Sequence, residues 1–296
     1  MPDGDLLHRF LFERLLIRGH LVRLDASWRA AIEHQDYPRA VSDALGQAMA
    51  ASALLAGSLK FEGRLSLQVE GAGDLRLLLA QCTHRHAIRG VARQRAVPST
   101  ARNIAELCGS GQLAVTIEQE GRADSYQGVV PLDQPELSAC LEQYFERSEQ
   151  LPSRLMLVST PLRSAGLLLQ RVAMGDTESQ TMTDDAWRRI GLLAATLSAA
   201  ELLQLPCVEL LRRVFPEDDI RLFTGTPVWF QCSCSRERVA GILQSLGENE
   251  LQALLRERDD VEVRCEFCNR AWHFDAVDVM GLFSGGSHKA APPGLH

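Results

Sequence analysis

The sequence predicts an α+β fold: an N-terminal mixed α/β domain with mostly antiparallel sheets, then a mostly helical linker, then a small cysteine-containing C-terminal domain. Three observations predict this organisation. Apolar and polar residues alternate strictly at 64–70 and again at 112–132, which is typical of antiparallel strands. Helical periods dominate from 187 to 215. Four of the eight cysteines fall in two close pairs after residue 231.

The first sixty residues are expected to begin with a helix. Four apolar residues from Leu7 to Leu15 repeat at helical spacing, and Gly19 offers a stop. A short strand is expected at 20–25. A long helix of small residues, suited to close packing in a core, is expected from about 37 to 60.

The rest of the N-terminal domain, 1–176, is predicted to be mostly strands. At 64–70 the apolar residues Leu65, Leu67 and Val69 share one face, and 112–132 is typical of a hairpin. The other expected elements are a helix over 134–151 that Pro152 ends, and strands at 154–158 and 165–173.

The linker, 177–231, is predicted to be helical after a polar hinge at 175–185. From 187 to 205, twelve of nineteen residues are apolar, so this segment must lie on another surface. Ser198 and Glu201 have the spacing of a capping box. The segment 224–231 is expected to be a turn. An ordinary subdomain that caps the first domain remains an alternative interpretation.

The two cysteine pairs predict a metal site. Cys232 and Cys234 form a C-x-C pair, and thirty residues later Cys265 and Cys268 form a C-x-x-C pair. Each short spacing lets two sulfurs point at a common centre, and two such loops give four thiolates in a tetrahedron with zinc–sulfur bonds near ~2.3 Å. We therefore expect a zinc-binding domain with four cysteine ligands over 232–283.

Within this domain, two helices separated by Gly247 are expected, followed by a strand at 259–268 and a return strand at 271–279. The tail, 284–296, is rich in Gly, Pro and Ala and is expected to be disordered.

Other candidate ligands are weaker. With four cysteines available, His273 is expected to be a surface or structural residue. Cys82, His84 and His86 alternate, so on one strand they would share a face as metal ligands do, although a solvated strand edge is the commoner reason for such a pattern. Three lone cysteines, expected to be small buried hydrophobes, are Cys108, Cys140 and Cys207.

Catalysis is not indicated. A C-x-x-C pair can belong to a thiol oxidoreductase, but that motif needs a βαβ context, which the sequence before Cys265 lacks. No Gly-rich phosphate loop, G-x-S-x-G elbow or H-E-x-x-H helix occurs. The chain is therefore not expected to be an enzyme.

The charge balance disfavours nucleic acid as a partner. There are 31 basic and 38 acidic residues, for a net charge of −7. A zinc ribbon that binds nucleic acid or the translation machinery is the main alternative function. However, residues 225–296 hold seven basic and ten acidic groups, 7 − 10 = −3, whereas a phosphate-binding module should be basic.

The sequence shows neither an export signal nor a membrane span. Acidic residues precede the first apolar residues, and the most apolar segment, 48–59, is only twelve residues long. A reducing cytoplasm is therefore expected, where cysteine clusters bind metals or react with oxidants more often than they form structural disulfides.

Oxidation of such a site has a predictable effect. A module of about sixty residues buries a small core, so its folding depends on the metal. Oxidants convert thiolates to sulfenic acid and then to disulfides. Since each disulfide removes two ligands, loss of the metal, unfolding of the module and exposure of the apolar linker are expected to be coupled.

Several segments resemble the bacterial holdase family known as the thirty-three-kilodalton heat shock protein. The similar segments are CSCSRER (232–238) with CEFC (265–268) at the thirty-residue gap, YFERSEQLPSRL (144–155), HQDYPRA (34–40) and LHRFLFE (7–13).

The resemblance implies that Cys232, Cys234, Cys265 and Cys268 bind one zinc ion when reduced. It also implies that disulfides Cys232–Cys234 and Cys265–Cys268 form on oxidation, that zinc leaves and that the linker unfolds. The active form implied is an ATP-independent chaperone that dimerises and holds unfolding client proteins.

Overall fold

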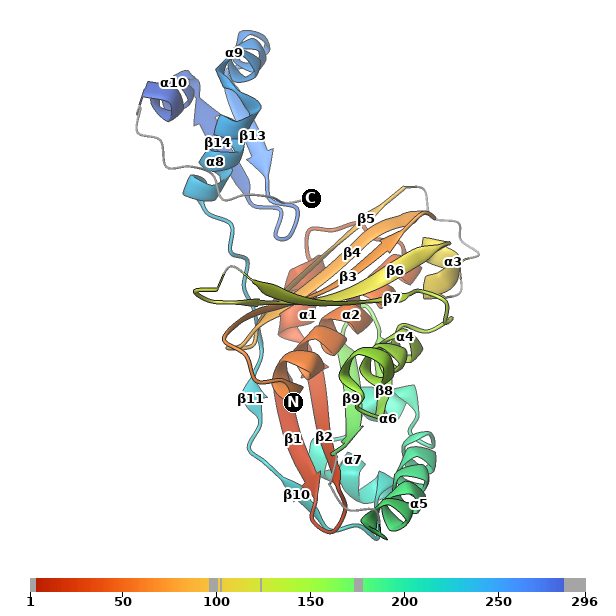
Figure 1. Ribbon diagram of the computed structural model, residues 1–296. Coiled ribbons are helices and arrows are strands. Elements are labelled where there is room, and N and C mark those ends of the chain that lie inside the picture. The colour runs from red at the N-terminus through yellow and green to blue at the C-terminus, as the bar shows by residue number, and fades with distance from the viewer. Residues whose placement is uncertain (1–3, 96–100, 102, 123, 173–177, 285–296) are drawn as a thin grey trace. The chain divides into compact units, whose positions relative to one another are not determined.

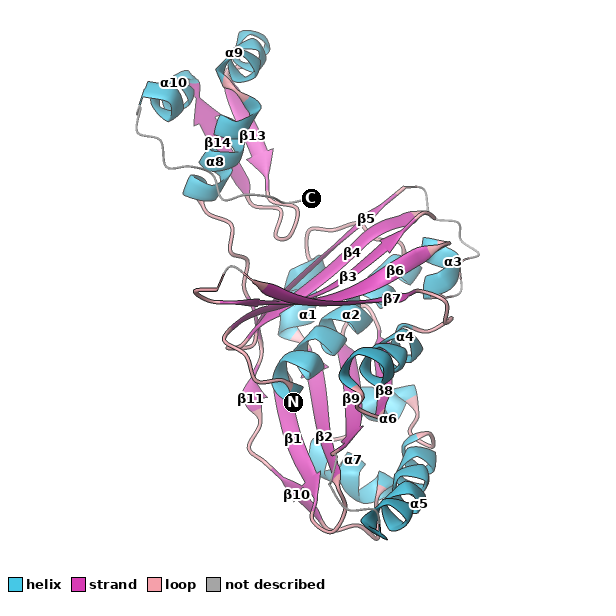
Figure 2. Cartoon of the chain, viewed as in Figure 1, coloured by secondary structure: helices cyan, strands magenta, loops and turns pink. Residues whose placement is uncertain are grey.

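A computed structural model describes residues 4–95, 101, 103–122, 124–172 and 178–284, which belong to two compact units divided between Gln231 and Cys232. The expected α+β class with antiparallel sheets is confirmed (Figure 2). None of the described helices is long and apolar enough to cross a membrane.

The first unit contains two sheets (Figure 1). Sheet A has the order β10-β1-β2-β9-β8, with β11 also paired to β1, and sheet B has the order β12-β5-β4-β3-β6-β7. Among the described strands of this unit, all pairs are antiparallel except β12 with β5. The strands are β1 Leu6–Phe12, β2 Ile17–Leu24, β3 Gly63–Gly71, β4 Leu75–Thr83, β5 Ala87–Gln94, β6 Gly111–Gln119, β7 Ser125–Pro131, β8 Ser153–Ser159, β9 Ser164–Arg171, β10 Ile220–Leu222, β11 Thr226–Pro227 and β12 Trp229–Phe230.

The long helix α2, Arg39–Ser58, contacts strands of both sheets and lies in the larger core. Its small residues are required there, because a Cβ atom at Gly46 would lie 2.1 Å from the Ser159 hydroxyl oxygen. The prediction of this helix is confirmed. The other helical elements of the unit are α1 Ala26–Ile32, α3 Ile104–Cys108, α4 Leu137–Tyr144, a π-helical turn Phe145–Glu149, α5 Glu178–Ala194, α6 Ala199–Gln204 and α7 Cys207–Val214.

The predicted N-terminal helix is wrong, since this segment forms strand β1. Leu7 is buried in the core around α2, whereas Phe10 and Phe12 are buried in a second core on the opposite face of sheet A. A strand that is apolar on both faces lacks the alternation by which strands are recognised. The expected strand at 64–70 and the hairpin at 112–132 are confirmed.

The second core lies between sheet A and helices α5 to α7. Ile190 and Leu197 are buried there, and Trp187 and Leu193 pack against it. The apolar residues of this segment therefore lie on another surface, as predicted, and that surface is a face of sheet A. The capping box of Ser198 is confirmed. Residues 173–177 lie outside the described residues, but 178–185, expected to belong to a hinge, are the first turns of α5.

The segment 220–231 is also more ordered than the predicted turn. It contributes β10 and β11 to sheet A and β12 to sheet B. Strands of two or three residues carry no periodic pattern, and their partners lie far away in the sequence.

Over 232–284, the part of it that the structure describes, the second unit is a two-stranded antiparallel sheet with three helices (Figure 1). The predicted return strand ends at Asp275, and the residues after it form a helix instead. Six apolar residues, among them Leu251 and Phe274, are buried in its core. The elements are α8 Arg236–Leu246, α9 Glu248–Glu257, β13 Asp260–Arg264, β14 Ala271–Asp275 and α10 Ala276–Ser284.

Candidate metal centre

Four thiols converge in the second unit. The sulfur atoms of Cys232, Cys234, Cys265 and Cys268 all lie within 4.8 Å of one another, and within the described part of the chain they are the only such cluster of possible ligands. The Sγ atoms of Cys232 and Cys265 are 3.6 Å apart, and those of Cys234 and Cys268 are 3.5 Å apart. A tetrahedron with ~2.3 Å zinc–sulfur bonds has edges of about 3.8 Å, so these four residues fit zinc.

The first cysteine loop is held by the arginine that follows it. The Arg238 guanidinium donates to the Ser233 carbonyl across 2.9 Å and to the Ser233 hydroxyl across 2.7 Å. The hydroxyl of Ser235 caps α8 by accepting a hydrogen bond from the backbone N–H of Arg238. The loop between Cys232 and Cys234 is therefore held against the start of α8 by Arg238.

A second arginine joins this loop to the hairpin. Arg236 donates to the carbonyl of His273 across 2.9 Å, forms a 2.7 Å ion pair with Asp278, and lies over the Phe274 ring. Both arginines belong to the CSCSRER segment, but their structural roles are not visible from the sequence. Two arginines within four residues of a metal-ligand pair are the signal that could have indicated them.

The second loop is a tight turn between β13 and β14. The backbone N–H of Cys265 donates to the Arg270 carbonyl, and the N–H of Asn269 donates to the Cys265 carbonyl across 2.7 Å. Asn269 adopts a positive φ of 54°, which asparagine tolerates better than most residues. This turn places Cys265 and Cys268 on the same side.

The thiols differ in acidity. Burial acts to raise the pKa of Cys232, but hydrogen bonds from the Cys234 backbone and from neighbouring thiols hold this pKa below its usual value. Burial raises the pKa of Cys234 and of Cys268, and the hydrogen bond to Cys232 and the charge on its sulfur raise both further, against one opposing hydrogen bond in each case. All four side chains are half-buried, so a small oxidant can reach them.

Cys108, Cys140 and Cys207 are buried in the first unit, as predicted, and Cys82 is buried there as well. Burial raises the pKa of Cys82 and of Cys108 to about 12, so these thiols stay protonated at neutral pH. The expectation that Cys82, His84 and His86 share one face of a strand is wrong. Both histidines lie in the turn between β4 and β5. His273 is exposed and pairs with Asp260, outside the thiol cluster, as expected.

The chain directly before the first thiol is bound to the sheets of the first unit. The backbone N–H of Gln231 donates to the Ile88 carbonyl on β5 across 3.0 Å, and the N–H of Val228 donates to the Asp5 carbonyl across 2.9 Å. The Ser27 hydroxyl donates to the carbonyl of Val228. Ordered backbone therefore continues to the residue that precedes Cys232.

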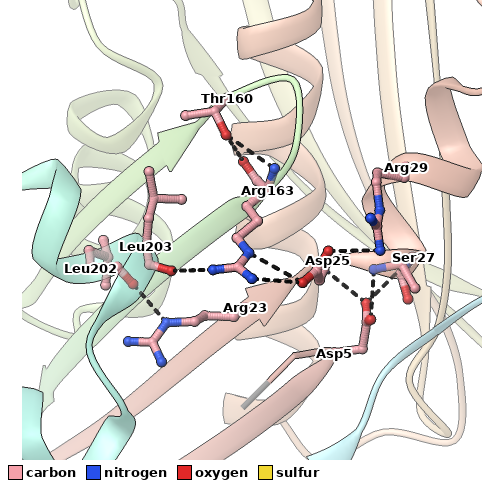
Figure 3. A network of polar contacts seen from close by, with 10 residues as sticks. Asp5, Arg23, Asp25, Ser27, Arg29, Thr160, Arg163, Leu202 and Leu203 are labelled. Carbon is pink, nitrogen blue, oxygen red and sulfur yellow. Dashed lines mark hydrogen bonds and ion pairs between the residues drawn. The ribbon is translucent and has the colours of Figure 1, made fainter. Parts of the chain in front are cut away.

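Two arginines of the first unit bind the end of α6 (Figure 3). The Nε of Arg23 donates to the Leu202 carbonyl across 2.8 Å, and Arg163 reaches the Leu203 carbonyl at 3.5 Å. Carbonyls at the C-terminal end of a helix lack hydrogen-bond donors from within the helix, and the two arginines supply these donors. Sequence reasoning missed both residues, because their partners are backbone atoms distant in sequence.

A carboxylate network holds Arg163 in place (Figure 3). Asp25 pairs with Arg163 at 3.1 Å and with Arg29 at 3.0 Å. The carboxylate of Asp5 accepts hydrogen bonds from the backbone N–H groups of Asp25 and Ser27 at the start of α1. One polar network thus holds α6 through Arg163 and holds Val228 through Asp5 and Ser27.

A family model described as Hsp33 protein matches residues 5–275, which include all four clustered cysteines. The chain belongs to the Hsp33 family. This is a family of chaperones, so membership supports a chaperone function and gives no support to an enzymatic one.

Relatives of Hsp33 type match along nearly the whole chain. A 33 kDa chaperonin of Nitrosococcus oceani is 47% identical over 285 residues, covering 96% of each chain. A 33 kDa chaperonin of Azotobacter vinelandii is 42% identical over 301 residues, covering 100% of each. The crystal structure of the 33 kDa chaperonin of Thermotoga maritima has a TM-score of 0.80 at 23% identity, covering 95% of this chain and 98% of that one, and supports the fold.

Proposed function

We propose that this Hsp33 family member is a redox-regulated, ATP-independent holdase, inactive when reduced and zinc-bound and active when oxidised. The observation that carries the proposal is the cluster of four thiols within 4.8 Å, which begins one residue after the hydrogen bond of Gln231 to the first unit. In this proposal Cys232, Cys234, Cys265 and Cys268 are both the zinc ligands and the redox sensor of a domain over 232–283.

Zinc would supply much of the stability of this domain. Its core contains six buried residues among those described, all apolar, which are too few for a large hydrophobic contribution. Structural zinc contributes about 10–16 kcal/mol in small finger peptides, whereas whole domains are stable by only about 5–15 kcal/mol. Removal of the ion is therefore expected to unfold the domain.

A peroxide supplies the oxidising equivalents. One thiolate attacks the peroxide oxygen and becomes a sulfenic acid, with release of water once a proton is taken up. A neighbouring thiol then attacks the sulfenic sulfur, a disulfide forms and a second water leaves. Each disulfide consumes one peroxide and two of the four thiols, so two peroxides remove the complete ligand set.

The apolar surface released by this event would be the second core. The linker, proposed to extend over 177–231 beside an N-terminal domain of 1–176, covers Phe10 and Phe12 of β1 and Leu167 and Leu169 of β9. Unfolding of its helices would expose these side chains to clients. Such a surface suits unfolding proteins, whose own apolar residues are exposed.

The active form is proposed to be a cytoplasmic homodimer that binds unfolded or oxidatively damaged proteins. Two chains that each expose an apolar sheet face can cover part of it against each other. Nucleic acid is not a proposed partner, because the region from 225 onward carries a net negative charge.

The test follows aggregation of a thermally unfolding protein with the reduced and the peroxide-treated chain. We expect suppression only after oxidation. Cys234→Ser removes one ligand and is expected to suppress aggregation without oxidant, whereas His273→Gln, outside the thiol cluster, keeps the redox dependence. Equal suppression by the reduced and oxidised wild-type chain would reject the proposal.

A further inference from the structure

The outer edge of β1 is occupied by a segment of the same chain (Figure 1). Residues Phe10 to Phe12 pair with β10, and Leu6 and Leu7 pair with β11. Additional hydrogen bonds join the N–H of Phe223 to the Arg9 carbonyl and the N–H of Glu13 to the Asp219 carbonyl, both at 2.9 Å. The segment 219–228 therefore covers β1 from end to end.

The segment 219–228, which occupies this edge, is only weakly built as a strand. Its two paired parts have three and two residues, separated by 223–225, and Pro227 has no N–H to donate. Both residues of β11 are exposed, and no residue of β10 is fully buried. The segment also belongs to the proposed linker, so it is expected to leave when the linker unfolds.

Its departure would leave a long free edge. On β1 the backbone groups of Arg9 and Glu13 point toward β10, and by strand alternation those of Leu11 do as well. These groups would lose their partners while β1 stays paired with β2 over Leu6 to Leu11. A free edge of this kind is a template for an added strand.

The present occupant shows which side chains fit. Ile220 and Leu222 pack against the second core, while Arg221 between them is exposed. An added strand would thus place alternate residues over Phe10 and Phe12, in the space that the linker helices vacate. The site selects an extended segment with apolar residues at every second position.

We propose that the edge of β1, uncovered when 219–228 leaves, binds an extended segment of the client protein as an added antiparallel strand. This rests on the proposed function and locates its client site. Strand β7, another sheet edge, pairs with β6 alone among the described strands and is largely exposed already in the folded state. It cannot account for binding that begins on oxidation, whereas the edge of β1 can.

The experiment uses a synthetic peptide with the sequence of the occupant, DIRLFTGTPV (219–228). It is added to the oxidised full-length chain during the aggregation assay. Two matched peptides are methylated on one backbone nitrogen, at Phe223, whose N–H bonds Arg9, or at Leu222, whose N–H points away from β1. A fourth peptide carries a photoreactive group in place of the exposed side chain of Arg221.

We expect the unmodified and the Leu222-methylated peptides to abolish suppression. The Phe223-methylated peptide should need a roughly tenfold higher concentration, because one backbone hydrogen bond is lost and the methyl group occupies its place. The photoreactive peptide should label residues 6–12 of the oxidised chain and leave the reduced chain unlabelled.

Several results would overturn the proposal. Suppression that no peptide affects, although the photoreactive peptide labels β1, would mean that clients bind elsewhere. Peptides that dissociate an oxidised dimer and leave suppression intact would make this edge a contact between two copies. Absence of labelling after oxidation would mean that the edge stays covered. Absence of suppression in both redox states would reject the proposed function, and the client site with it.

Discussion

The Sγ atoms of Cys234 and Cys268 lie 3.5 Å apart, although the residues are 34 positions apart in sequence. Two short loops must fold toward each other to achieve this, and each is fixed by contacts of its own, through Arg238 in the first loop and Asn269 in the second. Unbonded thiols do not attract one another strongly, so such a cluster is typical of a metal-binding site.

Metal removal gives the first prediction. We expect one zinc ion per reduced chain, and a strong chelator should make the region after Cys232 sensitive to protease while residues 1–172 remain resistant, because the small core of the second unit needs the ion. Zinc content by mass spectrometry and limited proteolysis measure both. Retention of a compact second unit after complete zinc loss would contradict the prediction.

The disulfide pairing is the second prediction. The resemblance implies pairing within each loop, Cys232–Cys234 and Cys265–Cys268, whereas the closest sulfurs in the reduced state belong to different loops. We expect the within-loop pairs, because a pair confined to one loop can persist once the rest of the domain has unfolded. Peptide mapping of the oxidised chain under non-reducing conditions distinguishes the two pairings. A Cys232–Cys265 bridge would contradict the prediction and show that the disulfides join the sulfurs that are neighbours in the folded, reduced chain.

The third prediction concerns the polar network at α6. Asp25→Asn weakens the ion pair that positions Arg163, so α6 and α7 should exchange amide hydrogens faster, and less peroxide should be needed for activation. Loss of a partly buried ion pair costs about 1–3 kcal/mol, or up to roughly a hundredfold faster exchange. Glu118→Gln breaks the Arg64–Glu118 pair between β3 and β6 of sheet B and serves as the control.

The specific readout for Asp25→Asn is where exchange increases. A general loss of stability would speed exchange in β3 and β4 as much as in α6 and α7. Faster exchange confined to the linker helices is expected, and Asp25→Glu should restore slow exchange in part. Uniform acceleration across the first unit would mean that Asp25 stabilises the whole unit and has no particular role at α6.

Thiol accessibility is the fourth prediction. In the reduced, metal-free chain, a thiol reagent should modify Cys232, Cys234, Cys265 and Cys268 and spare Cys82, Cys108 and Cys140, because these three are buried outside the proposed linker and at least Cys82 and Cys108 stay protonated. Peptide mass spectrometry should find these three thiols unmodified in native buffer and all eight cysteines modified in denaturant. Rapid modification of Cys82 in native buffer would contradict the burial described above.

Acid pH gives the fifth prediction. Burial lowers the pKa of His20 to about 3, and the charges of Arg18 and Arg9 act in the same direction. Between about pH 6.5 and pH 3, His20 is protonated in the unfolded chain and neutral in the folded chain. Protonation therefore stabilises the unfolded chain, and the free energy of unfolding should fall as the pH drops from about 6.5 toward 3. His20→Gln should flatten this dependence in denaturant titrations, whereas His34→Gln, at an exposed site, should leave it unchanged.

Much of the fold could be predicted where each segment faces one core. The hairpin of β6 and β7 and the helix α2 have one clear period, and both are confirmed. The start of the chain could not, because β1 is apolar on two faces and its residues also match helical spacing. The strands of 220–230 gain their order from pairing with β1 and β5, which no local pattern records.

The site was predictable for a different reason. Metal ligands must be particular residue types at short spacings, so the four cysteines are visible in the sequence, and their sulfurs come together once two loops meet. The residues that hold these loops use backbone carbonyls and rings as partners, which any sequence offers. Helix α10 had an overlooked signal, since Asp275 and Asp278 cap its start with reciprocal hydrogen bonds of 2.8 and 3.2 Å.

Sheet A has apolar side chains on both faces, and this determines where a partial denaturation would end. If α5 to α7 unfold, the face of sheet A that they cover becomes exposed to solvent. The opposite face stays packed against α2, with Leu7, Val22 and Leu168 in the larger core. The loss of order would then stop at the plane of the sheet. The proposed function, in which the linker helices unfold while sheet A stays folded, requires such a boundary, and a sheet buried on a single face could not provide one.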